Sequence, residues 1–187
     1  LANASGRLGN GRVILRKGSF SKIEDILTSL QINEIDGVLF DLGVSMLQLK
    51  DYSRGFSFSS QETLDMRMDV SQQLSAWDIV NTYPEKELEK ILREFGEEPF
   101  ARRIAKAIAI NRKTAAINTC VELAEIIARA YGRRGKTHPA TKTFQALRIA
   151  VNRELDELKE GLSGAMKMLR HGGRMCVISY HSLEDRI

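Results

Sequence analysis

A strand, a helix and a second apolar strand follow one another at the start of the sequence. Residues 12–15 (Arg-Val-Ile-Leu) have the composition of a short strand. Ser21 and Glu24 have the spacing of a capping box, so a helix is expected to begin there and to end near Gln31. Residues 37–41 (Gly-Val-Leu-Phe-Asp) then predict an apolar strand that ends in an acid. This order predicts a parallel βαβ unit, and so an α/β fold whose sheet is covered on both faces.

Helical patterns dominate the rest of the chain. Short helices are expected over 76–81, over 85–95, after Pro99 and over 121–130. A long helix is expected after residue 139, because apolar side chains recur at steps of three and four from Phe144 to Leu169.

The long helix is expected to end at the glycine pair of residues 172–173, and residues 174–180 predict a third strand. The expected division is then a sheet-containing domain over 1–69 and 139–187, interrupted by a helical insertion over 70–138.

The composition narrows the class of protein. No apolar run approaches the roughly 18 residues that a membrane-spanning helix needs. Cys120 and Cys176 each lie in an apolar stretch and are expected to be reduced thiols in the core. With three histidines and no cluster of Cys and His, no metal site is expected.

The formal net charge is +4 and the sequence pI about 9.1, and the basic residues are clustered. Simple solubility is one explanation of this charge; a polyanionic partner is the other, and the clustering favours it. The clusters are Arg102, Arg103, Lys106, Arg112 and Lys113, followed by Arg129, Arg133, Arg134, Lys136, Lys142 and Arg148.

Ligands of open parallel sheets bind beyond the carboxyl ends of the strands, and several candidate residues fall there. Asp41 directly follows a predicted strand, so its carboxylate could accept a hydrogen bond from an amine, or simply cap the next turn. Phe20 could stack on an adenine ring or fill the core. His138 and His181 each begin a loop at a predicted junction.

The long loop over residues 42–68 alternates charged and apolar side chains, including Arg54, Phe56, Asp65 and Arg67. Arginine and aromatic residues together suit single-stranded nucleic acid, through phosphate pairing and base stacking. The alternative is structural, with Asp65 and Arg67 holding the loop in place.

Several ordered motifs closely resemble one family, the bacterial and organellar small-subunit ribosomal RNA cytosine-N4 methyltransferases (the RsmH or MraW family). The similarity extends over essentially the whole chain. The motifs are Asp41-Leu-Gly-Val-Ser with Gln48-Leu, Arg54-Gly-Phe-Ser-Phe, Leu64-Asp-Met-Arg-Met-Asp, Phe95-Gly-Glu-Glu, residues 138–149 (His-Pro-Ala-Thr-Lys-Thr-Phe-Gln-Ala-Leu-Arg-Ile), Val151-Asn-Arg-Glu-Leu and Ile178-Ser-Tyr-His-Ser-Leu-Glu-Asp-Arg.

The resemblance implies a class I, Rossmann-like methyltransferase fold interrupted by an all-helical domain. It implies methyl transfer from S-adenosylmethionine to the exocyclic N4 amine of a cytidine in the decoding region of small-subunit (16S-type) ribosomal RNA. The implied partner is this RNA or the 30S-type ribosomal subunit, in a bacterial cytoplasm or an organelle; a homodimer is left open.

Motif matching assigns the cofactor contacts, whereas the catalytic and RNA-binding candidates follow from position in the predicted fold and from the clustering of charge. Phe20, Asp41 and Gln48 correspond to positions that contact the cofactor, and Asp41, Ser45 and His181 are the candidates for the catalytic site. The candidates for holding RNA are Arg54, Phe56, Asp65, Arg67, Arg102, Arg103, Arg133, Arg134 and His138.

The sequence also departs from the family pattern. The family opens with a Gly-rich loop and an acid that grip the cofactor, and Leu1 lies beyond both, so we expect a chain truncated at its N-terminus. Met46-Leu47 stands where Ser-Pro is common, and Tyr180 where Phe is usual. Two alternatives remain: a related methyltransferase that acts on DNA or protein, and a non-catalytic RNA-binding or folding-defective fragment.

Overall fold

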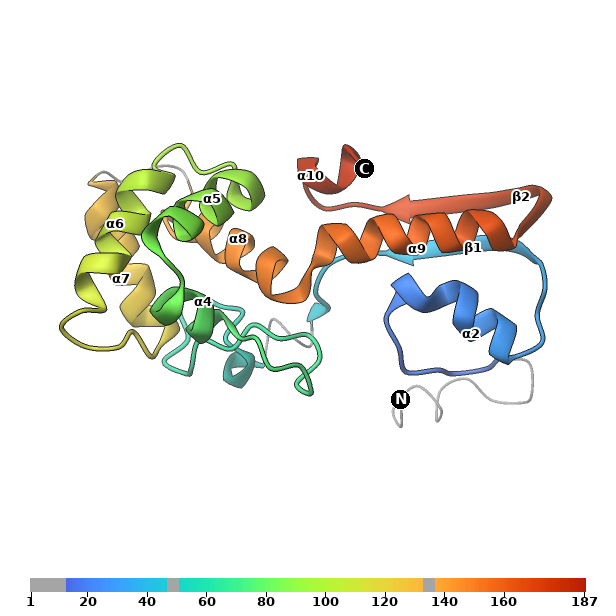
Figure 1. Ribbon diagram of the computed structural model, residues 1–187, viewed down its shortest axis with the longest axis horizontal. Coiled ribbons are helices and arrows are strands. Elements are labelled where there is room, and N and C mark those ends of the chain that lie inside the picture. Colours follow the sequence, from blue (N-terminus) through green and yellow to red (C-terminus); the bar gives the residue numbers. More distant parts are fainter. Residues whose placement is uncertain (1–12, 47–50, 133–136) are drawn as a thin grey trace. The chain divides into compact units, whose positions relative to one another are not determined.

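The computed structural model describes residues 13–46, 51–132 and 137–187 (Figure 1). The chain forms two compact units. We call them the sheet unit, drawn from Leu1–Gly43 and Leu155–Ile187, and the helical unit, drawn from Val44–Glu154. Among the described residues, no helix has both the length and the apolar composition to cross a bilayer.

Over the part of the chain that is described, the sheet unit contains a two-stranded parallel sheet. Its strands pair in register from Gly37 with Arg174 to Asp41 with Ile178. Because the strands are parallel, both carboxyl ends meet at one edge of the sheet. Its elements are η1 (Phe20–Lys22), α2 (Ile23–Ser29), β1 (Ile35–Asp41), α9 (Glu154–Met168), β2 (Leu169–Ile178) and α10 (Ser182–Asp185).

The parallel pairing confirms the expected sheet type, but two details of the prediction were wrong. Residues 13–15 form no strand, despite their apolar composition, and the side chains of Val13 and Ile14 are exposed. The expected cover on both faces is also missing from the described part of the chain. Phe40 is buried with Leu158 and Ala165 of α9, whereas Leu39, on the opposite face, is 62% exposed.

Cys176 is paired with Leu39 in the sheet register, and neighbours in register point to the same face. This thiol is therefore exposed, not in the core as expected, whereas Cys120 of the helical unit is buried. Both cysteines are free, as predicted.

In its described residues, the helical unit contains five longer helices and one 3₁₀ turn. Leu64 and Met66 of the long loop lie in its core together with side chains from every one of these helices. The elements are η2 (Tyr52–Arg54), α4 (Ala76–Thr82), α5 (Glu85–Gly96), α6 (Ala101–Asn111), α7 (Cys120–Tyr131) and α8 (Thr141–Asn152). The compact unit is thus wider than the expected insertion over 70–138, because it includes the loop before that range and the helix after it.

Local sequence signals explain the helix boundaries. Ser75 with Asp78 and Thr119 with Glu122 form capping boxes at the starts of α4 and α7. Gly132 ends α7 with a φ of 73°, a left-handed conformation that costs glycine little.

The single long helix expected after residue 139 is instead two helices. Arg153 lies between α8 and α9 with a φ of 50°, in the left-handed region, and this breaks the helix although the apolar periodicity continues through it. The second helix ends at Met168, four residues before Gly172, and the intervening residues already belong to β2.

Candidate functional site

Asp41 is the last residue of β1, at the edge where the two strands end. The Leu42 amide donates to the Ile178 carbonyl at 3.2 Å, so the pairing continues one step past the strand. The Asp41 side chain is exposed. A carboxylate held by a strand and open to solvent can accept hydrogen bonds from the amine of a ligand.

The chain beyond β2 returns to Asp41 through Tyr180. The Tyr180 hydroxyl donates to Asp41 Oδ1 at 3.0 Å. This hydrogen bond, and the negative charge of the carboxylate, raise the pKa of Tyr180 above its ordinary value. Sequence reasoning noted Tyr180 only as a departure from the family pattern. The available signal was its position two residues past a strand end.

Glu184 organises the same turn. It is buried, and its Oε2 accepts the amide hydrogens of Tyr180 at 2.7 Å and His181 at 3.3 Å. His181 Nε2 lies 3.3 Å from Glu184 Oε1, an ion pair when the imidazole is protonated. The expected site residue His181 therefore directly follows Tyr180, at the same edge as Asp41.

Phe20 also reaches this part of the sheet unit. Its ring packs edge-on against Phe40, with 5.6 Å between the centroids, and lies over Gly161 of α9. Phe20 is nevertheless 37% exposed. It therefore fills space between the strand and the helix while part of its ring stays open for a ligand.

The other predicted cofactor and catalytic residues are not brought to this edge by the sheet unit. Ser45 belongs to the helical unit and is exposed, and Gln48 lies outside the described residues. Of the five residues proposed for cofactor binding or catalysis, the sheet unit thus contains Phe20, Asp41 and His181.

In the long loop, Asp65 and Arg67 form a part-buried ion pair. Arg67 Nε donates to Asp65 Oδ1 at 2.7 Å and Arg67 NH2 to Asp65 Oδ2 at 2.8 Å. Arg67 NH1 also donates to the carbonyls of Val70 and Gln72. The hydrogen bond from Arg67 is the main cause of the lowered pKa of Asp65. These contacts support the structural alternative, in which Asp65 and Arg67 hold the loop in place.

Arg54 serves the same loop. Its NH2 donates to the carbonyls of Arg67 at 2.6 Å and Met68 at 3.0 Å, and its guanidinium lies 5.9 Å from the centre of the Phe56 ring. Phe56 in turn packs against the core of the helical unit. The side chains of this loop that were predicted to bind RNA therefore contact other parts of the helical unit.

Asn152 of α8 fixes the loop from the other side, and sequence reasoning gave it no role. Its Oδ1 accepts the Met68 amide at 2.7 Å, and its Nδ2 donates to the Met66 carbonyl at 2.8 Å. Met66 has a φ of 60°, so the loop is held in a conformation that a non-glycine residue rarely adopts. No sequence signal marked this role, because the polar Arg148 lies one turn before Asn152 on the same face of α8.

His138 stacks on an aromatic side chain of the same unit. Its ring lies parallel to that of Phe58, with 4.2 Å between the centroids and 3° between the planes. Its Nδ1 accepts the Ala140 amide at 3.2 Å, so the neutral ring carries its proton on Nε2. The side chain is exposed, which leaves the predicted RNA contact sterically accessible.

The basic residues fall into three sets: those with partners inside the protein, those outside the described residues, and those that are exposed. Arg112 donates to the Val80 and Tyr83 carbonyls, and Arg148 pairs with Glu154, so both support the fold of their own unit. Arg133, Arg134 and Lys136 lie outside the described residues. The basic residues of α6 and of the end of α7 are exposed: Arg102, Arg103, Lys106 and Arg129.

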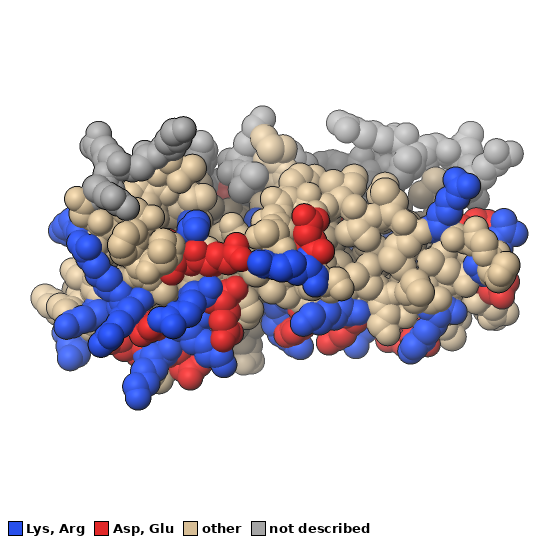
Figure 2. All heavy atoms as spheres, turned by 90° about the horizontal axis from the view of Figure 1, so that it is seen from above, with Lys and Arg blue, Asp and Glu red and all other residues tan. Residues whose placement is uncertain are grey.

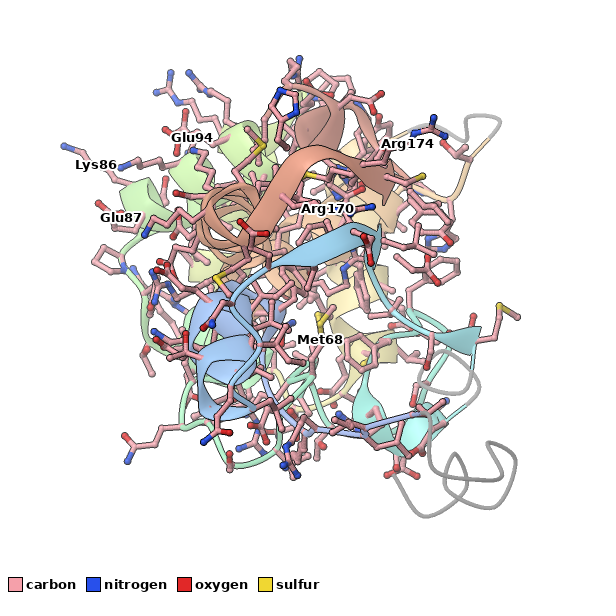
Figure 3. The ribbon with its side chains drawn as sticks, turned by 90° about the vertical axis from the view of Figure 1, so that its right-hand side faces the viewer. Met68, Lys86, Glu87, Glu94, Arg170 and Arg174 are labelled. Atoms are coloured by element: carbon pink, nitrogen blue, oxygen red, sulfur yellow. The ribbon has the colours of Figure 1, made fainter. Side chains whose placement is uncertain are left out.

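Helix α6 differs from its neighbour α5 in charge. Within its bounds α6 has no acidic residue, and Arg102, Arg103 and Lys106 have no ion-pair partner among the described residues. Helix α5 mixes both signs, and its Lys86 and Glu87 project outward together (Figure 3). Figure 2 likewise shows acidic side chains among the Lys and Arg side chains over the helical unit, at the left of the view. The α6 face is therefore the better candidate for an anionic partner.

The comparisons with known proteins agree on one family. The MraW methylase family profile matches residues 1–187. The chain is 56% identical to the ribosomal RNA small subunit methyltransferase H of Persephonella marina, over 95% of this chain and 61% of that protein. It is 54% identical to the protein of the same name from Caldicellulosiruptor bescii, over 90% of this chain and 55% of that protein. It is 50% identical to that of Brevibacillus brevis, over 100% of this chain and 61% of that protein.

The chain thus spans about 55 to 61% of the length of these curated relatives. The family match covers every residue of the chain, and it includes the segment with Asp41 and the segment with Tyr180 and His181. This chain belongs to the MraW methylase family.

Proposed function

We propose that the protein transfers a methyl group from S-adenosylmethionine to the exocyclic N4 amine of a cytidine in small-subunit ribosomal RNA. The observation that carries this proposal is the position of Asp41. Its exposed carboxylate ends β1 beside the end of β2, where ligands of open α/β sheets bind. The family membership supports the class of reaction, and the names of the relatives support the class of substrate. In fold terms, we assign the sheet unit to a class I, Rossmann-like methyltransferase domain and the helical unit to an all-helical domain inserted into it.

The residues at this edge fit a cofactor that carries an adenine and an amine. The positive φ of Gly43 gives a tight turn after Asp41, and the exposed part of Phe20 offers an aromatic surface. Phe20 and Asp41 are therefore the residues that would hold the cofactor, with Gln48 the third expected contact. When bound, the cofactor would supply a methyl group already activated by its sulfonium.

The acceptor amine of cytosine is a weak nucleophile, because its lone pair is delocalised into the ring. The contribution of the protein is to accept one of its N–H hydrogens, to orient the nitrogen and to exclude water. Asp41 is suited to accept that hydrogen, and His181, at the same edge, is the second polar group available. Ser45 remains our third candidate for this catalytic role.

We assign the RNA contacts chiefly to the α6 face and to His138. Exposed arginine and lysine without acidic partners can neutralise phosphates, and an exposed stacked ring can receive a base. Arg133 and Arg134 extend this set along the sequence. We give Arg54, Phe56, Asp65 and Arg67 a supporting role, because their side chains already hold the loop.

The test compares two acids of the same strand. Asp41→Ala is expected to weaken binding of S-adenosylmethionine and to abolish methylation of small ribosomal subunits. Asp36→Ala is the matched control: Asp36 lies at the opposite end of β1, where it pairs with Arg170 at 2.6 Å. Equal methylation by the two variants would refute the assignment. If the protein binds the cofactor but methylates DNA or protein instead of ribosomal subunits, the related-methyltransferase alternative is favoured. If it binds RNA but not the cofactor, the non-catalytic alternative is favoured.

A further inference from the structure

The Tyr180 side chain covers one side of the turn that follows β1. A Cβ atom added to Gly43 would lie 3.7 Å from Tyr180 Cδ2, so the ring lies beside this turn. The hydroxyl of the same ring donates to Asp41 Oδ1 at 3.0 Å. The side chain is 68% exposed, so most of the ring is open to solvent.

Backbone contacts hold Tyr180 in this position independently of its ring. The Tyr180 amide donates to the buried Glu184 carboxylate at 2.7 Å, and the preceding Ile178 carbonyl accepts the Leu42 amide at 3.2 Å. The backbone at and before Tyr180 is thus held by the sheet unit itself. These backbone hydrogen bonds place the Tyr180 side chain next to Asp41.

One oxygen of the Asp41 carboxylate is therefore occupied by the protein. Tyr180 is the partner that the structure gives this side chain among the described residues. The second oxygen, Oδ2, keeps its lone pairs for a ligand.

We propose that Tyr180 is a positioning residue, which fixes Asp41 so that its Oδ2 receives the exocyclic amino group of a nucleobase. This inference rests on the proposed function, because it deepens the role given there to Asp41. It adds a residue that neither the motif assignments nor the charge pattern identified. The ligand class is an amino-substituted base, either the adenine of the cofactor or the cytosine of the acceptor.

The electrostatics of the pair agree with this role. The Asp41 carboxylate raises the pKa of Tyr180, so the phenol keeps its proton throughout the neutral range. The hydroxyl therefore remains a donor and the carboxylate remains an acceptor. An amino group can donate to Oδ2, whereas an oxo group at the same place would bring two acceptors together. The pair should consequently distinguish amino from oxo bases.

The experiment uses two pairs of nucleosides in which an oxo group replaces the exocyclic amino group and the neighbouring ring nitrogen becomes N–H. Binding of adenosine is compared with inosine, and binding of cytidine with uridine, by calorimetry on the wild-type chain and on Tyr180→Phe. The phenylalanine variant keeps the ring and removes only the hydroxyl. Losing one hydrogen bond that orients the carboxylate should reduce the amino preference roughly 3- to 10-fold. If adenosine binds more tightly than inosine, the adenine of the cofactor is the ligand of Asp41. If cytidine binds more tightly than uridine, the cytosine of the acceptor is the ligand.

A second readout is independent of affinity. The alkaline titration of Tyr180, followed by tyrosinate absorbance, should move to lower pH in Asp41→Asn and should move when an amino base binds to the wild type. Tyr131→Phe is the matched control, because Tyr131 packs against Phe100 in the helical unit. This control should leave both the amino preference and the Asp41-dependent titration unchanged.

The outcomes separate this inference from the proposed function. If Asp41→Asn loses the amino preference while Tyr180→Phe retains it in full, Tyr180 has no positioning role and the proposed function stands. If Asp41→Asn changes neither the preference nor cofactor binding, the proposed function fails as well. A wild-type chain without any amino preference would overturn the inference directly.

Discussion

The ring of Phe20 lies directly over Gly161, close enough that a Cβ on residue 161 would be 2.7 Å from Phe20 Cδ2. The same Cβ would lie 3.2 Å from the Phe20 carbonyl oxygen, so the backbone of η1 would have to move as well. The absence of a side chain at Gly161 thus sets where Phe20 sits. Phe20, which we propose to contact the cofactor, therefore packs against a residue that lies 141 positions later in the sequence.

Gly161→Ala is expected to destabilise the sheet unit by displacing Phe20. Overpacking costs about 1–3 kcal/mol, which exceeds the gain of about 1 kcal/mol that alanine brings to a helix. Denaturant unfolding should report a net loss in the free energy of unfolding, and calorimetry a weaker affinity for S-adenosylmethionine. Ser163→Ala, at an exposed position of the same helix, is the control and should change neither the free energy of unfolding nor the cofactor affinity. Unchanged cofactor affinity in a destabilised Gly161→Ala protein would remove Phe20 from the cofactor site.

Replacement of Arg67 by methionine should weaken the helical unit in a pH-dependent way. The hydrogen bond from Arg67 lowers the pKa of Asp65, so the pair stabilises the fold above the ordinary carboxyl pKa of about 3.9. The stabilisation is lost as the pH falls through the lowered value. We expect a loss of about 1–3 kcal/mol near neutral pH and a smaller difference between variant and wild type at about pH 3. Urea unfolding at the two pH values measures this, and equal differences at both would contradict the role of the pair.

Asn152→Ala should release the long loop from α8. The side chain makes hydrogen bonds to the Met68 amide, the Met66 carbonyl and the Arg148 carbonyl. Their loss should lower the free energy of unfolding by about 2–4 kcal/mol and increase amide hydrogen exchange around Met66 and Met68. Thr141→Ala, at an exposed position in the first turn of the same helix, is the control. Protection of the loop in the Asn152 variant at the wild-type level would show that other contacts suffice.

The α6 face should contribute to RNA affinity through phosphate neutralisation. Arg102→Ala combined with Lys106→Ala is expected to weaken binding of a small-subunit ribosomal RNA fragment at low salt. It should also reduce the slope of log K against log salt by roughly 0.7 for each lost contact to single-stranded RNA. Lys86→Ala combined with Lys90→Ala removes the same charge from α5, where acidic residues lie among the basic ones. Equal losses in the two double variants would indicate a general charge effect instead of a specific surface.

The two thiols should differ in reactivity. Burial raises the pKa of Cys120 to about 12, and its Sγ contacts the Gly55 carbonyl at 3.3 Å, whereas Cys176 is exposed on the sheet. Since the thiolate is the reactive form, an alkylating reagent at neutral pH should modify Cys176 in the native protein and Cys120 only after unfolding. Mass spectrometry of the labelled peptides measures this, and rapid native labelling of Cys120 would show that the helical unit opens readily.

The sequence by itself determined the features that depend on nearby residues. The capping residues Ser75 and Thr119 and the apolar periodicity of α5 to α8 fixed most helix starts, because these signals act within one or two turns. The apolar runs before Asp41 and Tyr180 predicted two strands, and the structure pairs them in parallel. The βαβ unit expected over residues 12–41 was wrong in its first strand, because residues 13–15 form none. The family was also readable from the sequence, since its motifs are contiguous and ordered.

Only the tertiary structure decided how the side chains of those motifs are used. Asp65, Arg67 and Arg54 have the composition of a nucleic-acid contact, yet they bind one another and the backbone, because a loop of that length needs partners for its polar groups. The break at Arg153 could not be read from periodicity, because a left-handed residue leaves the apolar pattern almost unchanged. The hydrogen bond between Tyr180 and Asp41 joins residues 139 positions apart, and it exists because a parallel sheet brings two distant strand ends to one edge.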